Sequence, residues 1–166
     1  MTSFRSCYSS FITTNESKTQ DRCIIGYTHF FSPNRNFTGI EWHNITKAVK
    51  DIFSKAPSGL LCNGMAEVDT SPTIDDATIK FNGCEIDDQG HETFCVTKLF
   101  ANKEFNFCKT AQKPYDLYVV ATLCVMHSYA PGALNIRSNG AAPDWAAGLA
   151  LAQSYDKNIE MQKIKD

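Results

Sequence analysis

Short apolar runs rich in β-branched and aromatic residues recur along the chain, a pattern typical of strands. The first run, 22–31, stops at Ser32-Pro33 and predicts a central strand. Loops rich in Gly, Asn and Asp separate the runs of the middle third, which favours antiparallel pairing. Later strands are predicted at 60–62, 78–81, 92–96, 105–107 and 134–137.

Two helices are predicted from caps and periodicity. Thr38 and Glu41 have the spacing of a capping box, and apolar residues then recur on one face until 57–59 breaks the pattern. The last helix is expected to begin at Pro143 or Asp144 and to fray after residue 155.

A third helix is expected from Pro114 to about residue 128, because proline is well tolerated in a first helical turn. It is apolar nearly all round, so we expect it to be buried against the sheet. The predicted order is β-α-β-β-β-β-α-β-α. This order indicates an α+β fold, a layered domain with a mostly antiparallel sheet and about three helices.

The length of 166 residues and the 43% hydrophobic content are sufficient for one buried core. A single domain is expected over 21–156. Residues 1–20 are rich in Ser, Thr and Asn and predict a flexible or partner-binding arm, whose anchors would be Phe4, Tyr8 and Phe11. Residues 157–166 are expected to form a polar tail.

The net charge of -2 provides no overall attraction to nucleic acid or to an anionic membrane, so either partner would need a local patch. The longest apolar run, 117–126, is about half of what a bilayer requires. The first twenty residues also lack the pattern of a signal peptide. The sequence therefore predicts a soluble cytoplasmic protein without a membrane partner.

Seven cysteines form no C-x-x-C pair, and their odd number favours reduced thiols. Cys108 and Cys124 have apolar neighbours and are expected to be inert core residues. A zinc site at Cys84, His91, Cys95 and Cys108 is an alternative, but its spacing matches no usual zinc motif. No metal site is assigned, and the sequence does not identify a cofactor.

Lys109, Thr110 and Lys113 precede the predicted buried helix, where free backbone N–H groups and the helix dipole favour an anion. With Tyr115 and Asp116 they form a candidate phosphate-binding segment. It lacks the glycines of a Walker loop. In the alternative, the lysines are solvated, Tyr115 packs, and Asp116 interacts with the helix dipole.

Tyr27 and His29 alternate on the first strand and therefore point to one face. His29 is a candidate acid–base group, or else a hydrogen-bonded core histidine. Glu92 is the second catalytic candidate, since His91 beside it would face the other side. Arg137, at the end of the last predicted strand, is expected near the lysine segment as a ligand-binding residue, or else is an ordinary surface arginine.

Several segments together resemble a family of small bacteriophage and bacterial proteins. They are Gly26–Phe31, Phe81–Gly83, Glu92–Phe94, Phe107–Asp116, Ser138–Gly140 and Asp144–Trp145. The resemblance spans about 24–155. Two positions depart from the family pattern: 30–31 is Phe-Phe instead of Tyr-Trp, and Asn139 replaces an Asp, so this turn lacks a carboxylate. The resemblance implies a viral or microbial setting and carries no activity.

Two functions therefore remain open. The first is binding of a phosphate-bearing small molecule or nucleotide through the lysine segment, with or without turnover. The second is a structural or interaction subunit of a larger assembly, such as a virion or a ribonucleoprotein, docked through the N-terminal arm. A metal-dependent enzyme ranks behind both. The two leading functions differ in whether the lysine segment, Tyr27 and His29 share one pocket.

Overall fold

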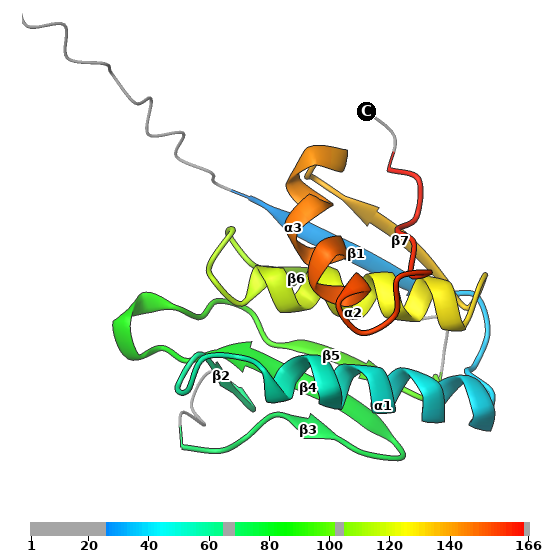
Figure 1. Cartoon of the computed structure of the whole chain (residues 1–166), viewed down its shortest axis with the longest axis horizontal. Coiled ribbons are helices and arrows are strands. Elements are labelled where there is room, and N and C mark those ends of the chain that lie inside the picture. The colour runs from blue at the N-terminus through cyan, green and yellow to red at the C-terminus, as the bar shows by residue number, and fades with distance from the viewer. Residues whose placement is uncertain (1–25, 65–68, 102–104, 165–166) are drawn as a thin grey trace, which may run out of the picture.

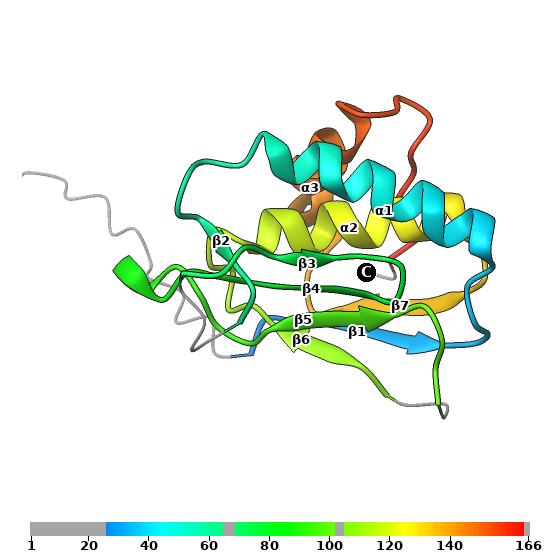
Figure 2. The same cartoon turned by 90° about the horizontal axis from the view of Figure 1, so that it is seen from below.

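The computed structural model describes residues 26–64, 69–101 and 105–164. Two antiparallel sheets lie side by side, and three helices cover one face of them (Figure 1, Figure 2). The predicted α+β class is confirmed. The predicted N-terminal arm, its anchors and the first residues of the predicted first strand lie outside the described residues.

The strands are β1 (Thr28–Pro33), β2 (Leu61–Cys62), β3 (Thr73–Ile74), β4 (Thr78–Gly83), β5 (Phe94–Thr97), β6 (Phe107–Lys109) and β7 (Leu134–Ser138). The helices are α1 (Gly39–Ser54), α2 (Asp116–Tyr129) and α3 (Ala142–Gln153), with a short 3-10 helix at Ile86–Asp88. One sheet has the order β6-β1-β7, so the first strand is central, as predicted. In the other sheet β4 pairs with β2, β3 and β5.

The strand β3 was not expected, because a two-residue strand leaves no alternating pattern to detect. Its pairing with β4 depends on a tight turn at Asp75. The Asp75 Oδ1 atom accepts hydrogen bonds from the N–H groups of Ala77 and Thr78 at 2.9 and 2.8 Å. A side chain that satisfies backbone donors in this way stabilises the turn.

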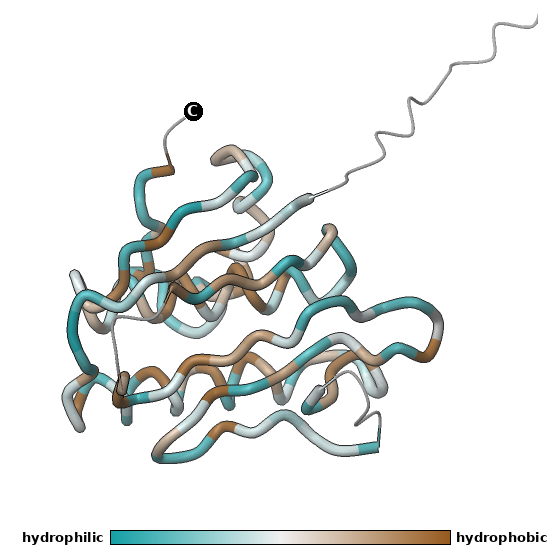
Figure 3. Tube along the Cα trace, turned by 180° about the vertical axis from the view of Figure 1, so that it is seen from behind, coloured by the Kyte–Doolittle hydropathy of each residue, from teal (hydrophilic) through white to brown (hydrophobic). Residues whose placement is uncertain are grey.

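The first helix begins at the predicted capping box. Thr38 Oγ1 accepts from the Glu41 N–H at 3.2 Å, and Glu41 Oε2 accepts from the Thr38 N–H at 2.9 Å. The apolar face of α1 is buried, as its periodicity indicated. Figure 3 shows that hydrophobic positions also recur along the strands and the other helices.

The second helix is the centre of the core. Every residue from 118 to 126 is buried, because α2 packs against both α1 and α3 above the sheets (Figure 2). It begins at Asp116, after Pro114 and Tyr115 have formed a turn, and not at Pro114. Gly148 allows the close approach of α3, since a Cβ at that position would meet the side chain of Val120.

Residues 157–164 pack against the domain. Ile159 is fully buried, and the Glu160 N–H donates to Ser128 Oγ at 2.8 Å. Gln162 Oε1 accepts from the Ile136 N–H at 3.2 Å, so the segment runs along the free edge of β7. The tail is mostly polar, but Ile159 is buried and Met161 and Ile164 pack against the core. No helix in the described parts of the chain is long and apolar enough to cross a membrane.

Candidate functional site

His29 lies on the helix-facing side of β1, fully buried and hydrogen-bonded through both ring nitrogens. Its Nε2 atom is 2.7 Å from Asp116 Oδ1, at the start of α2. Its Nδ1 atom is 3.0 Å from Ser138 Oγ, on the neighbouring strand β7, where the two residues are register partners. Three separate elements thus place a serine, a histidine and an aspartate in one chain of hydrogen bonds.

The acceptors around His29 determine its tautomer. A carboxylate only accepts hydrogen bonds, so Nε2 carries the proton that points to Asp116. In the neutral ring Nδ1 is then an acceptor, and the Ser138 hydroxyl donates to it. Ser138 Oγ in turn accepts from the Gly140 N–H at 2.9 Å. The hydroxyl proton of Ser138 is therefore directed at His29.

Thr110 belongs to the same network. Its hydroxyl donates to Asp116 Oδ1 at 2.6 Å, and its side chain is fully buried. Ala111 and Gln112 then take left-handed φ values of 50° and 53°, which turn the chain from β6 back toward α2. Such values are uncommon outside glycine, and here they bring Thr110 and Asp116 together.

Tyr27 and Trp145 enclose His29 from two sides. Their rings meet the imidazole edge-on, with centroid separations of 5.2 and 5.3 Å. The Tyr27 hydroxyl and the Trp145 Nε1 atom are both buried, and neither has a hydrogen-bond partner in the structure described. A buried donor without a partner is costly, so each of these two groups would be stabilised by a further polar partner.

Burial raises the pKa of Tyr27 to about 12, and the negative charges of Asp116 and Asp144 add to the rise. The polar side chains of Gln112 and Ser138 act in the opposite direction and lower this pKa, but neither meets the geometry of a hydrogen bond to the Tyr27 hydroxyl. The phenol is therefore protonated at neutral pH, and it can donate a hydrogen bond.

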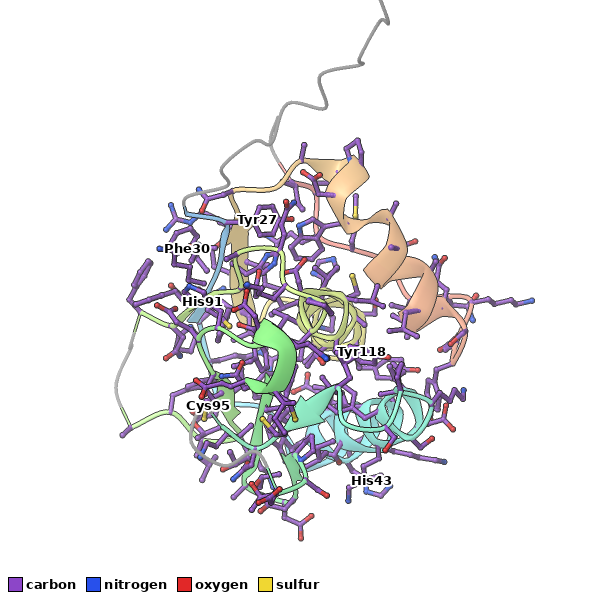
Figure 4. The ribbon with its side chains drawn as sticks, turned by 90° about the vertical axis from the view of Figure 1, so that its left-hand side faces the viewer. Tyr27, Phe30, His43, His91, Cys95 and Tyr118 are labelled. Carbon is purple, nitrogen blue, oxygen red and sulfur yellow. The ribbon has the colours of Figure 1, made fainter. Side chains whose placement is uncertain are left out.

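The sheet separates Lys109 and Arg137 from this network. In the register of β1, Thr28 is paired with Lys109, and Phe30 is paired with Arg137. Side chains alternate along a strand, so these residues lie on the face away from the helices, opposite Tyr27 and His29. Figure 4 shows Tyr27 and Phe30 on opposite sides of β1. The predicted pocket shared by all these residues is thus divided between two faces.

The helix-free face of β6-β1-β7 carries an aromatic cluster. Phe105 and Phe107 are 55% and 51% exposed. The ring centroids of Phe30 and Phe105 are 5.6 Å apart, and those of Phe105 and Phe107 are 6.0 Å apart. The Arg137 guanidinium carbon lies 5.8 Å from the centre of the Phe30 ring. A cation thus lies within reach of one of the partly exposed rings.

Glu92 and Tyr115 have structural roles in the arrangement observed. Glu92 lies in the loop before β5, not on the strand as predicted, and its Oε2 atom accepts from the Lys109 N–H at 2.7 Å. The buried Tyr115 hydroxyl donates to the Glu92 carbonyl at 2.7 Å. Burial raises the pKa of Tyr115 and raises that of Cys108 to about 12. The side chains of Glu92 and Tyr115 therefore hold the loop before β5 against β6 and the turn that follows it.

Lys113 forms an ion pair with the exposed carboxylate of Asp88. It also lines a depression of about 240 Å³ at the start of α2, together with Asp116 and Asp144. This depression has two carboxylates for one lysine, and that lysine is already paired. Its charge does not favour a phosphate, because like charges repel. The anion expected at the helix start is provided by the protein itself, as Asp116.

Metal ligands do not gather in the parts of the chain that the structure describes. No group of three or more His, Cys, Asp or Glu side chains there is placed to hold an ion. Cys84 and Cys108 are buried, whereas Cys95 is exposed.

Ser138, Gly140 and Trp145 belong to the site, although the sequence indicated them only as turn and helix residues and as parts of the segments that carry the family resemblance. The alternation of β7 places Ser138 and Arg137 on opposite faces. Only the pairing of β7 with β1 shows which face holds His29. Nothing in the sequence distinguishes an ordinary turn serine from one that donates a hydrogen bond to a distant histidine.

No protein-family model matches the chain, and neither a curated protein nor a solved structure matches it.

Proposed function

We propose that this protein binds single-stranded nucleic acid on the helix-free face of β6-β1-β7. The observation that carries the proposal is the cluster of Phe30, Phe105 and Phe107 beside the cation Arg137. This ligand differs from the predicted phosphate-bearing small molecule or nucleotide: it is a polynucleotide, and it would lie on the other side of the sheet from His29.

The chemistry of this face suits unpaired bases. Bases stack on aromatic rings irrespective of sequence, and each stacked base contributes about 1–3 kcal/mol. A sheet that displays such rings is a common platform for single strands, because their bases are free to separate from one another. Two of the three rings here are about half exposed.

The charge of this face suits a phosphate backbone. Arg137 and Lys109 lie on either side of β1, and the other outward positions of these strands are uncharged. Those positions are Thr28, Phe30, Ser32, Phe107 and Asn135. The net charge of -2 for the whole chain therefore does not describe this surface.

The test is fluorescence anisotropy with labelled single strands of about 20 thymidines or uridines and a 20-base-pair duplex. We expect the single strands to bind more tightly than the duplex. Phe107→Ala and Phe30→Ala should each weaken binding about tenfold or more, since a lost stack is worth about 1–3 kcal/mol. Ile40→Ala is the matched control, because Ile40 is 77% exposed on α1, which lies on the other side of the sheets (Figure 2).

Salt dependence provides a second measurement. Two phosphate contacts predict a slope of about -1.4 for log K against log salt concentration, and Lys109→Ala should reduce it by about 0.7. Equal affinity of wild type and Phe107→Ala would contradict the proposal. Self-association that Phe107→Ala abolishes, without single-strand binding, would identify the cluster as a protein contact instead.

A further inference from the structure

We infer that Ser138 is a nucleophile, activated by His29 and Asp116, for the hydrolysis of short acyl esters. This activity goes beyond nucleic-acid binding, and it uses the opposite face of the sheet. The serine hydroxyl is 3.0 Å from His29 Nδ1, and His29 Nε2 is 2.7 Å from Asp116 Oδ1. Serine, histidine and carboxylate in this order define a base-activated hydroxyl.

The hydrogen bonds around Ser138 orient it for attack. Its hydroxyl donates to Nδ1, and its oxygen accepts from the Gly140 N–H at 2.9 Å, which leaves one lone pair for a carbonyl carbon. When Nδ1 takes the serine proton, the imidazolium is stabilised by Asp116, which Thr110 holds in place. The histidine therefore serves as the base and Asp116 as its orienting partner.

The Tyr27 hydroxyl is a donor for the charge that develops on the substrate oxygen. It is buried without a hydrogen-bond partner in the described structure. It also fills the place that a Cβ at Gly140 would occupy, so it lies beside the glycine that contacts Ser138. An unpaired O–H next to the nucleophile is the kind of group that stabilises an oxyanion.

Ser138 lines a cavity of about 330 Å³ between β7 and the segment 162–164. Ile136 and Ile164 form apolar parts of its wall, which suits a short acyl chain. The serine itself is only half-buried. We expect a small substrate to approach Ser138 through this cavity, since His29 itself is fully enclosed.

The reaction balances with water as the only other reactant. Ser138 Oγ bonds to the ester carbonyl carbon, and its proton passes to His29 Nδ1. The tetrahedral intermediate then expels the alkoxide, which leaves as the alcohol with the Nδ1 proton. Water attacks the acyl-serine, again giving its proton to Nδ1, and the serine takes that proton back as the carboxylic acid leaves.

The test uses the full chain with a tagged fluorophosphonate and with p-nitrophenyl acetate. We expect one fluorophosphonate per protein, mapped to Ser138 by mass spectrometry. Ser138→Ala should abolish the label and the ester hydrolysis, and Asp116→Asn should slow both at least tenfold. Ser128→Ala is the control, because the hydroxyl of Ser128 bonds to the Glu160 backbone and to no histidine.

Two further variants separate catalysis from stability. Tyr27→Phe should slow ester hydrolysis at least tenfold, whereas Ile40→Ala, at an exposed position of α1 outside the site, should leave it unchanged. Melting temperatures identify any variant that fails to fold. If Ser138→Ala does not fold, the peptide map of the labelled wild type decides the question. A wild type that takes no label, or that takes it at another residue, would overturn the inference.

Discussion

The side chains of His29 and Asp116 meet at 2.7 Å, although 87 positions separate them in the chain. The contact joins the central strand β1 to the first residue of α2. Asp116 Oδ1 also accepts the hydroxyl of Thr110, so one carboxylate oxygen satisfies two buried donors. This single residue therefore connects the stability of the domain to the geometry of the site.

Removal of this carboxylate should be costly. Asp116→Ala leaves His29 Nε2 and the Thr110 hydroxyl without an acceptor, and we expect a loss of about 2–4 kcal/mol in unfolding free energy. Asp116→Asn retains an acceptor oxygen and should lose less. Urea denaturation measures both. Asp51→Ala, which removes an exposed ion pair with Lys55, should lose no more than about 0.5 kcal/mol. Equal losses for Asp116→Ala and Asp51→Ala would mean that the network adds nothing to stability.

The burial of α2 has a direct consequence for core variants. Leu123 is fully buried, so Leu123→Ala should lower the unfolding free energy by about 2–5 kcal/mol, through lost apolar contact and the cavity left behind. Leu99 is 64% exposed, and Leu99→Ala should change it by less than about 0.5 kcal/mol. Chemical denaturation with an unchanged m value is the measurement. A loss below about 1 kcal/mol for Leu123→Ala would show that α2 is not the packed centre.

Alkaline pH should destabilise the fold. The pKa of Tyr27 rises from 10.0 to about 12 in the folded protein, so the folded state holds this proton more tightly than the unfolded state does. Its stabilisation is complete below pH 10 and is lost as the pH rises toward 12. Cys124, whose pKa burial raises from 9.0 to about 12, extends the loss down to pH 9.

Urea unfolding at intervals from pH 8 to 12 tests this pH dependence. Tyr27→Phe should show a shallower loss between pH 10 and 12, because it has no phenol to ionise. Cys124→Ala should show a shallower loss from pH 9. The same pH profile in Tyr27→Phe and wild type would contradict the assignment of this proton to Tyr27.

Thiol reactivity should distinguish the described cysteines. Cys95 is exposed, whereas Cys62, Cys84, Cys108 and Cys124 are buried. A brief pulse of N-ethylmaleimide followed by peptide mapping should therefore modify Cys95 first, and the four others only in denaturant. Early modification of Cys108 would indicate that the contact between the loop before β5 and β6 opens readily.

The sequence by itself determined the local elements and the character of the core. The Thr38–Glu41 capping box, the apolar face of α1 and the apolar run of α2 are short-range patterns, because helix formation depends on residues three and four positions apart. Alternation likewise indicated that Tyr27 and His29 share one face. These features depend on no distant part of the chain, so they could be predicted.

Tertiary structure alone decided which residues meet. Strand pairing placed Ser138 opposite His29. The register of β6 and β7 on β1, together with the alternation of side chains, placed Lys109 and Arg137 on the other face. The packing of the segment 157–164 likewise depends on Ile159, a single apolar residue between polar neighbours, whose burial no local pattern indicates. The physical reason is that pairing and register arise from long-range contacts. A shift of one residue in either strand would have reversed every face, and no local pattern in the sequence specifies that shift.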